Sequence, residues 1–279
     1  MSDTAFQTQY LTQFVDGFED RTTRLRGCTI TEANINGNAA VFLTADSGSA
    51  TATTRGVNGL IPARADNLTQ NTATLAEWHD LVRKTNFNIF ASQGNQMEIM
   101  QRTTMGVINR KIDDDVIAQL DTATVDTGAV QIASLALVAK AQTILGNAFV
   151  PIEDEDNMFG VITPAFRAYL TQIPEFSSSD FVEVMTMSGN IFKAKRWMGV
   201  NWIVHPRLTG VGTATEKCYM FHRNAIGHAV DKTTIESPVG YDAEQGYSWA
   251  RASVTMGSKL LQNSGVVQML HDGSAYVGA

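Results

Sequence analysis

The chain has 279 residues, 44% of them hydrophobic and 18% charged, which is enough to build at least one large core and excludes a disordered chain. Its formal net charge of −7 argues against a dedicated nucleic-acid-binding protein, because such proteins match phosphates with basic residues. No run approaches the roughly 18 apolar residues that cross a bilayer, and the first residues lack the pattern of a secretory signal. We therefore expect a soluble protein that contacts no membrane.

The N-terminal segment carries an aromatic stripe. Phe6, Tyr10, Phe14 and Phe18 recur every four residues, which predicts one face of a helix of roughly four turns. Such a stripe needs a partner. It can dock on the core of its own chain or on an adjacent subunit, and the sequence favours neither.

A long hairpin follows this segment. Asn36-Gly37 predicts a turn and residues 39–44 a strand, after which residues 45–76 are mostly Ser, Thr, Ala, Gly and Asn, with a second turn signal at Asn58-Gly59. A segment so poor in large apolar side chains cannot hold a fixed shape by burial, which contributes about 25 cal/mol per Å² of apolar surface. We therefore expect the hairpin to reach outward to a neighbour.

Few side chains of this hairpin can anchor it on another surface. The apolar candidates are Val57, Leu60 and Ile61. Arg55, Arg64 and Asp66 stand among neutral residues, so they could make charged contacts across a subunit boundary or remain solvated surface charges.

A short charged segment then leads into a long amphipathic helix, predicted from about Gln96 to Leu120 and ~37 Å long at 1.5 Å per residue. Apolar residues recur along one side, while polar residues that include Asp113 and Asp114 are expected on the other. Gly106 is expected to interrupt or bend the helix.

The middle of the chain predicts an α/β lobe. A helix ends near Gly146, residues 153–156 form an acidic loop, and residues 158–163 form a buried strand. Thr163 is placed to cap a second helix that begins at Pro164 and is expected to end before Pro174. Strands then predominate, and residues near the C-terminus alternate as in a half-exposed sheet.

The sequence contains few candidates for chemistry. Cys28 and Cys218 show no metal-binding spacing and are expected to be two buried thiols rather than a disulfide. His222 and His228 are expected to share a face of one strand without further ligands, so no metal is predicted. No cofactor or catalytic motif is present, although an oligomeric α/β enzyme that uses His205 or His222 remains an alternative.

The order of these segments resembles the major capsid proteins of tailed bacteriophages, which have the Hong Kong 97 type of fold. TTRGVNGLIPARADNLTQ, EWHDLVRKTNFNIFASQGNQ, MQRTTMGVINRKID and MGSKLLQNSGVV look most similar to those of short-tailed phages. The resemblance implies an α+β fold in five parts. These are an N-terminal arm (1–37), an extended β-hairpin loop (38–76), a peripheral domain with a long spine helix (77–127), an axial α/β domain (128–236) and a return to the peripheral sheet (237–279).

The resemblance also implies a function and partners. Copies of the chain would self-assemble into hexamers and pentamers of an icosahedral head that encloses double-stranded DNA without sequence-specific binding. The partners implied are a scaffolding protein, a portal protein and a decoration protein. The chain would assemble in the host cytoplasm and end in the capsid of the virion. The first lysine, Lys84, lies beyond the hairpin, so a lysine–asparagine cross-link from that loop is not expected. A nanocompartment shell of the encapsulin type is the alternative within this fold.

Overall fold

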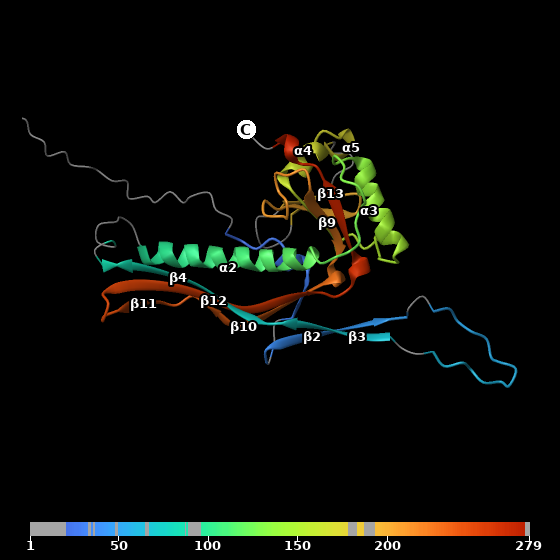
Figure 1. The fold of residues 1–279 in the computed structure, drawn as a ribbon, viewed down its shortest axis with the longest axis horizontal. Coiled ribbons are helices and arrows are strands. Elements are labelled where there is room, and N and C mark those ends of the chain that lie inside the picture. Colours follow the sequence, from blue (N-terminus) through green and yellow to red (C-terminus); the bar gives the residue numbers. More distant parts are fainter. Residues whose placement is uncertain are drawn as a thin grey trace, which may run out of the picture.

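The computed structural model describes residues 21–32, 35, 37–47, 50–64, 67–86, 88, 96–177, 183–186 and 193–276. Within these residues the chain forms two sheets of five and six strands, a separate two-stranded hairpin and a long helix (Figure 1). The predicted α+β fold is therefore confirmed. The aromatic stripe Phe6, Tyr10, Phe14 and Phe18 and the hairpin residue Asp66 lie outside the described residues.

The five-stranded sheet lies against the long helix. Its order is β1 (Ile30–Glu32), β10 (Ile226–Glu236), β12 (Tyr247–Leu260) and β11 (Val239–Asp242), and β4 (Ala76–Thr85) also pairs with β12. β1 runs parallel to β10, and the other pairs are antiparallel. The segment predicted only as short and charged is thus the ten-residue strand β4, whose pattern is mostly exposed because it borders β12 alone in this sheet.

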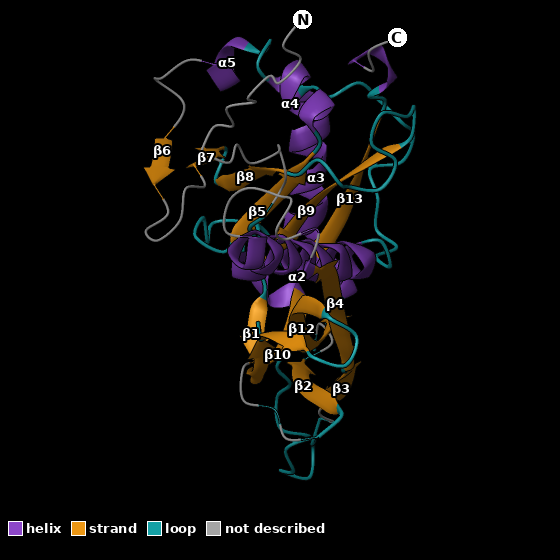
Figure 2. Cartoon of the chain, turned by 90° about the vertical axis from the view of Figure 1, so that its left-hand side faces the viewer, coloured by secondary structure: helices purple, strands orange, loops and turns teal. Residues whose placement is uncertain are grey.

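Helix α2 (Gln96–Leu120) has the predicted bounds and runs along one face of this sheet, beside β4 and β12 (Figures 1 and 2). Its apolar side packs on β10 and β12 through a cluster of Ile108, Ile112, Val230, Val254 and Met256. The prediction that Gly106 interrupts the helix is wrong. The helix continues through Gly106, which is buried because Arg21 passes over it; an added Cβ would lie 3.4 Å from Arg21 Cγ.

Asp113 corrects a second expectation for this helix. The residue was predicted on the solvent side but is only 2% exposed. Its carboxylate accepts hydrogen bonds from the backbone N–H groups of Arg24 and Leu25, at 2.9 and 3.1 Å, and lies 3.4 Å from His205 Nε2. These partners are distant in sequence, so the local pattern could not show them.

The six-stranded sheet has the order β13 (Val266–His271), β9 (Glu216–His222), β5 (Met158–Ile162), β8 (Val200–Val204), β7 (Lys193–Trp197) and β6 (Glu183–Thr186). β5 and β8 are parallel and the other neighbours antiparallel. Helices α3 (Leu135–Asn147) and α4 (Pro164–Leu170) join this sheet in one large apolar cluster. Short turns of helix complete the description: α5 (Pro174–Ser177), η1 (Arg26–Cys28), η2 (Arg223–Ala225), η3 (Asn263–Gly265) and η4 (Ser274–Tyr276).

The start of α4 confirms the predicted cap. Thr163 Oγ1 accepts a hydrogen bond from the N–H of Phe166 at 3.1 Å, and Pro164 is the first helical residue. The helix ends before Pro174, as expected, but it already stops at Leu170, and Pro174 begins α5. Proline suits a first helical turn, where its missing N–H has no intrahelical acceptor.

Strand β13 was predicted to be half-exposed and is almost entirely buried. The polar residue that creates its alternating pattern, Gln268, donates through Nε2 to the carbonyl oxygens of Leu120, Asp121 and Ala123, at 3.3, 3.1 and 2.8 Å. The segment after α2 therefore covers the strand and satisfies its buried amide.

Short connections carry the chain from one sheet to the other. Because η2 interrupts the predicted strand, His222 ends β9 and His228 lies in β10, so the two histidines occupy different sheets rather than one face. If the chain were divided by sheet, residues 226–260 would belong with β4 in the five-stranded sheet. Residues 266–271 would belong with β9 in the six-stranded sheet. The five-part division at 37, 76, 127 and 236 stays a prediction.

Both cysteines are free and buried, as predicted. Burial raises the pKa of the Cys28 and Cys218 thiols to about 12. Among the helices of the described residues, none is both long and apolar enough to span a membrane.

Candidate interaction surfaces

The root of the hairpin is held by close backbone packing. Strands β2 (Ala39–Asp46) and β3 (Asn67–Thr74) pair in antiparallel register and cross the end of the five-stranded sheet (Figure 1). A Cβ on Gly257 of β12 would lie 2.3 Å from the Thr74 carbonyl oxygen, and one on Gly227 of β10 would lie 2.9 Å from the Phe42 ring. Glycine at these two positions therefore permits the crossing.

Small side chains complete this root. Ala40, Ala73 and Ala229 form a buried cluster, and Asn71 Nδ2 donates to the Leu261 carbonyl oxygen at 3.2 Å. One face of the hairpin is thus fixed to its own subunit close to the sheet.

The free end of the hairpin has no such support. Residues 50–64 are all exposed, and Val57, Leu60 and Ile61 are 107%, 73% and 67% exposed. Gly59 donates its N–H to the Gly56 carbonyl oxygen at 2.8 Å, and Gly56 donates to Leu60 at 3.0 Å. These bonds close a turn that presents Val57 at the tip, close to the predicted Asn58-Gly59 turn.

The outward face of the two strands continues this apolar surface. Val41 and Leu43 of β2 and Leu68 of β3 are all exposed, whereas Phe42, which alternates with them, faces the body of the subunit. We call Val41, Leu43, Val57, Leu60, Ile61 and Leu68 the hairpin strip. Exposed apolar side chains gathered along one projecting element mark an interaction surface.

The charged residues of the hairpin make weaker contacts. Arg55 Nη1 donates to the Gly59 carbonyl oxygen and Arg64 Nη1 to the Ser47 carbonyl oxygen, each at 3.3 Å. Both guanidinium groups brace the loop and remain exposed to solvent.

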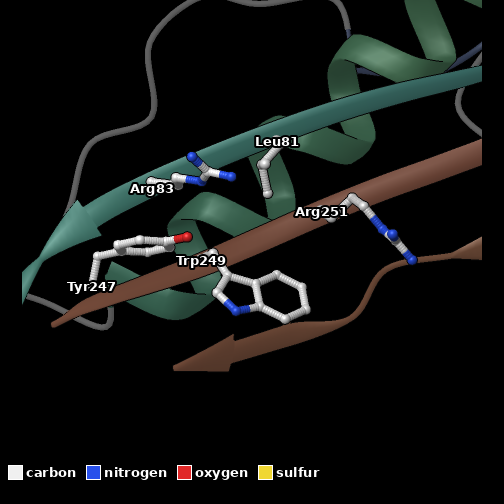
Figure 3. A pocket seen from close by; sticks show the side chains of 5 residues that line it. All are labelled: Leu81, Arg83, Tyr247, Trp249 and Arg251. Carbon is white, nitrogen blue, oxygen red and sulfur yellow. The ribbon is translucent and has the colours of Figure 1, made fainter. Parts of the chain in front are cut away.

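A second surface lies on the five-stranded sheet, on the face that α2 does not cover (Figure 3). Its shallow hollow, about 200 Å³, is lined by Leu81, Arg83, Tyr247, Trp249 and Arg251, which we call the sheet patch. The Trp249 ring lies over Gly240, where an added Cβ would come within 2.6 Å of it.

The two arginines of the sheet patch have partners within the chain. The Arg83 guanidinium lies 5.0 Å from the centre of the Tyr247 ring, and Arg251 Nη2 lies 3.5 Å from Glu236 Oε2. These contacts favour a rigid aromatic surface over an open site for an anion.

The histidines of the enzyme alternative are buried in structural roles. His205 Nδ1 accepts from the Arg207 N–H at 3.2 Å while its Nε2 faces Asp113. His222 Nδ1 accepts from the Asn224 N–H at 3.2 Å. No group of histidine, cysteine or carboxylate side chains in the described part of the chain could hold a metal ion.

The sequence predicted contact residues at the free end of the hairpin, but it did not predict the sheet patch. Arg55, Val57, Leu60, Ile61 and Arg64 all lie on the exposed hairpin, as expected of contact residues, although their contacts stay a prediction. The sheet patch was missed. Alternation along residues 247–255 places Trp249 and Arg251 on the same face of the strand, but it does not show which face of the sheet α2 leaves uncovered.

Comparison with known proteins gives one family. A family model described as phage capsid protein matches residues 2–273. No curated protein sequence matches the chain.

Solved structures show the same fold at low sequence identity. The capsid of Ralstonia phage GP4 is 11% identical with a TM-score of 0.70, covering 99% of this chain and 98% of that one. Mycobacterium phage Che8 is 15% identical with a TM-score of 0.68, covering 96% and 98%. The capsid of cyanophage P-SCSP1u is 12% identical with a TM-score of 0.67, covering 95% and 93%.

Proposed function

This chain belongs to the phage capsid protein family and is a structural major capsid protein, and we propose that its copies close into the hexamers and pentamers of an icosahedral head that encloses double-stranded DNA. The observation that carries the proposal is the hairpin, which is fixed at its root and exposes an apolar strip along its length. Contacts between different surfaces of identical copies close into rings, as a shell requires.

The hairpin strip supplies most of the proposed contact energy. Burying a side chain such as Val57, Leu60 or Ile61 contributes about 1.5–3 kcal/mol, so the three tip residues together contribute about 5–9 kcal/mol. An exposed ion pair through Arg55 or Arg64 contributes only about 0–1 kcal/mol. The hairpin therefore lies across an adjacent copy mainly through its apolar side chains.

The remaining partners are proposed by analogy with phage heads. A scaffolding protein, a portal protein and a decoration protein are the proposed partners, with assembly in the host cytoplasm before the chain takes its place in the virion. A role without catalysis is supported by the burial of His205 and His222, each of which accepts a backbone hydrogen bond at Nδ1. The net charge of −7 suits a wall that holds DNA without gripping its phosphates.

The test compares two variants of the hairpin tip by electron microscopy and sedimentation of expressed particles, with the scaffolding protein co-expressed. The triple variant Val57→Ser, Leu60→Ser, Ile61→Ser should leave folded subunits that form no shells. The matched control Arg55→Gln, Arg64→Gln alters the same loop without removing apolar area and should still form shells.

Normal particles from the triple serine variant would contradict the proposed role of the hairpin. The contents of purified particles separate the two kinds of shell: packaged DNA supports a phage head, and a cargo enzyme supports a nanocompartment.

A further inference from the structure

Phe149 combines a strained backbone with an exposed ring. It follows α3 with φ of 60°, in the left-handed region, and its ring is 87% exposed. The Val150 N–H donates to the Leu145 carbonyl oxygen and the Phe149 N–H to Gly146, each at 3.1 Å. This pattern ends a helix with a left-handed residue, a position that glycine fills best.

Phenylalanine is therefore unfavourable here in two independent ways. A residue with a Cβ is less stable than glycine in the left-handed region by about 1 kcal/mol or more. The exposed ring also leaves a large apolar area in water. Within the isolated subunit, glycine or asparagine at position 149 would avoid both effects.

A second strained residue is held against the same helix, α3. Met198, with φ of 52°, is the other non-glycine residue at positive φ in the described residues, and it is also exposed. It lies in the turn between β7 and β8, where its carbonyl oxygen accepts from Gln142 Nε2 of α3 at 2.5 Å.

Ile152 lies between the end of α3 and the turn that contains Met198. A Cβ on Gly146 at the end of α3 would lie 3.4 Å from Ile152 Cδ1, and one on Gly199 would lie 3.8 Å from the Ile152 carbonyl oxygen. We call Phe149, Ile152 and Met198 the α3-end patch. Backbone strain and exposed apolar side chains both concentrate where a protein makes contacts.

We propose that the α3-end patch is a contact between copies of this chain, in which Phe149 packs into the copy that also receives the hairpin. Figure 1 shows that the C-terminal end of α3 and the hairpin project toward the same side of the molecule. The same neighbour that receives the hairpin strip can then reach the α3-end patch as well. The inference rests on the proposed function, because it assigns a second contact to the same neighbour.

The first test is Phe149→Gly, which should act in opposite directions on folding and assembly. Because glycine fits the left-handed region, the melting temperature of the subunit should stay equal or rise. The concentration needed for shell formation should increase by about tenfold or more, since a buried phenylalanine contributes at least that factor. Phe149→Leu keeps an apolar side chain and is the matched control, which should assemble close to normally.

The second test measures whether position 149 becomes covered when the subunits assemble. Cys28 and Cys218 are buried, so Phe149→Cys places one accessible thiol at the patch. The variant, co-assembled at a low fraction with unmodified chain, should react with a maleimide in free subunits and be protected in shells.

Each remaining outcome has one meaning. Equal labelling in subunits and shells, or normal assembly of Phe149→Gly, would overturn the inference and leave the proposed function intact. Protection that appears only when a decoration protein is added would assign the patch to that partner and overturn the copy contact. Failure of the unmodified chain to form any shell would refute the proposed function itself.

Discussion

Asp113→Ala should cost a large part of the stability of the subunit. The Asp113 carboxylate accepts the backbone N–H of Arg24 at 2.9 Å and that of Leu25 at 3.1 Å, and it lies 3.4 Å from His205 Nε2. Asp113, which lies in α2, thereby connects residues 24–25 and the residue that follows β8 to this helix. Arg24 adds to the junction by donating from Nη1 to the Val204 carbonyl oxygen at 2.6 Å.

The magnitude follows from the groups left without a partner. Each buried N–H that loses its acceptor costs about 1–3 kcal/mol, so the loss of two predicts about 4 kcal/mol. Asp113→Asn retains one acceptor oxygen and should lose about half of this. Since domains are stable by only about 5–15 kcal/mol, the alanine variant loses a large fraction of the total.

Urea unfolding of the subunit measures this loss, and hydrogen exchange at the Arg24 and Leu25 amides locates it. The neighbouring Asp114, which pairs with Arg207 at 2.6 Å on the exposed side of α2, supplies the control Asp114→Ala. That control should lose less than about 1 kcal/mol. If Asp113→Ala lost no more than the control, the carboxylate would not hold the junction.

Three further predictions concern buried groups. Burial lowers the pKa of His228 to about 4, so as the pH falls the imidazole is protonated in the unfolded chain before it is protonated in the folded one. The free energy of unfolding should therefore fall by about 3 kcal/mol between pH 6.5 and 4. Urea titrations of His228→Gln should show a smaller dependence of this free energy on pH. Gly257→Ala would place a methyl group 2.3 Å from the Thr74 carbonyl oxygen, so it should destabilise the subunit by about 1–3 kcal/mol and abolish shells seen by microscopy. Cys28 and Cys218 should react with a thiol reagent only after urea unfolds the chain, and rapid reaction of the folded subunit would contradict their burial.

The parts of the fold that sequence predicted well depend on local signals. The bounds of α2 follow from its helical periodicity, and the start of α4 follows from the Thr163 cap followed by Pro164. The hairpin followed from strand and turn residues around a segment with too few apolar side chains to pack on itself. Each of these signals is contained within about one element of the chain.

The predictions that failed depend on distant partners. Asp113 bonds to a residue 89 positions away, and Gln268 bonds to one 145 positions away. Both polar side chains looked solvent-facing, because a local pattern cannot show an acceptor or donor supplied by another part of the chain. The sequence did not predict strand β4 for a different reason. Most of its side chains are exposed, so they give no alternating apolar pattern.

The candidate contact surfaces were partly visible in sequence for a related reason. The hairpin tip is conspicuous because Val57, Leu60 and Ile61 stand in a segment that cannot bury them. Phe149 gives no such signal, because an isolated phenylalanine after a helix looks like core until the backbone shows it to be left-handed and exposed. Its significance depends on a torsion angle, which the sequence does not contain.

Together, the hairpin strip and the α3-end patch explain why assembly should be more sensitive to substitution than folding. Both surfaces expose apolar side chains that the isolated subunit would be better without, so removing them should leave the subunit folded. In a closed ring each copy gives the contact to one neighbour and receives it from another, so one substitution weakens every boundary. A loss of only 1.4 kcal/mol at each boundary weakens each contact about tenfold. Variants of Val57 or Phe149 should therefore separate the two processes, while variants of Asp113 should impair both.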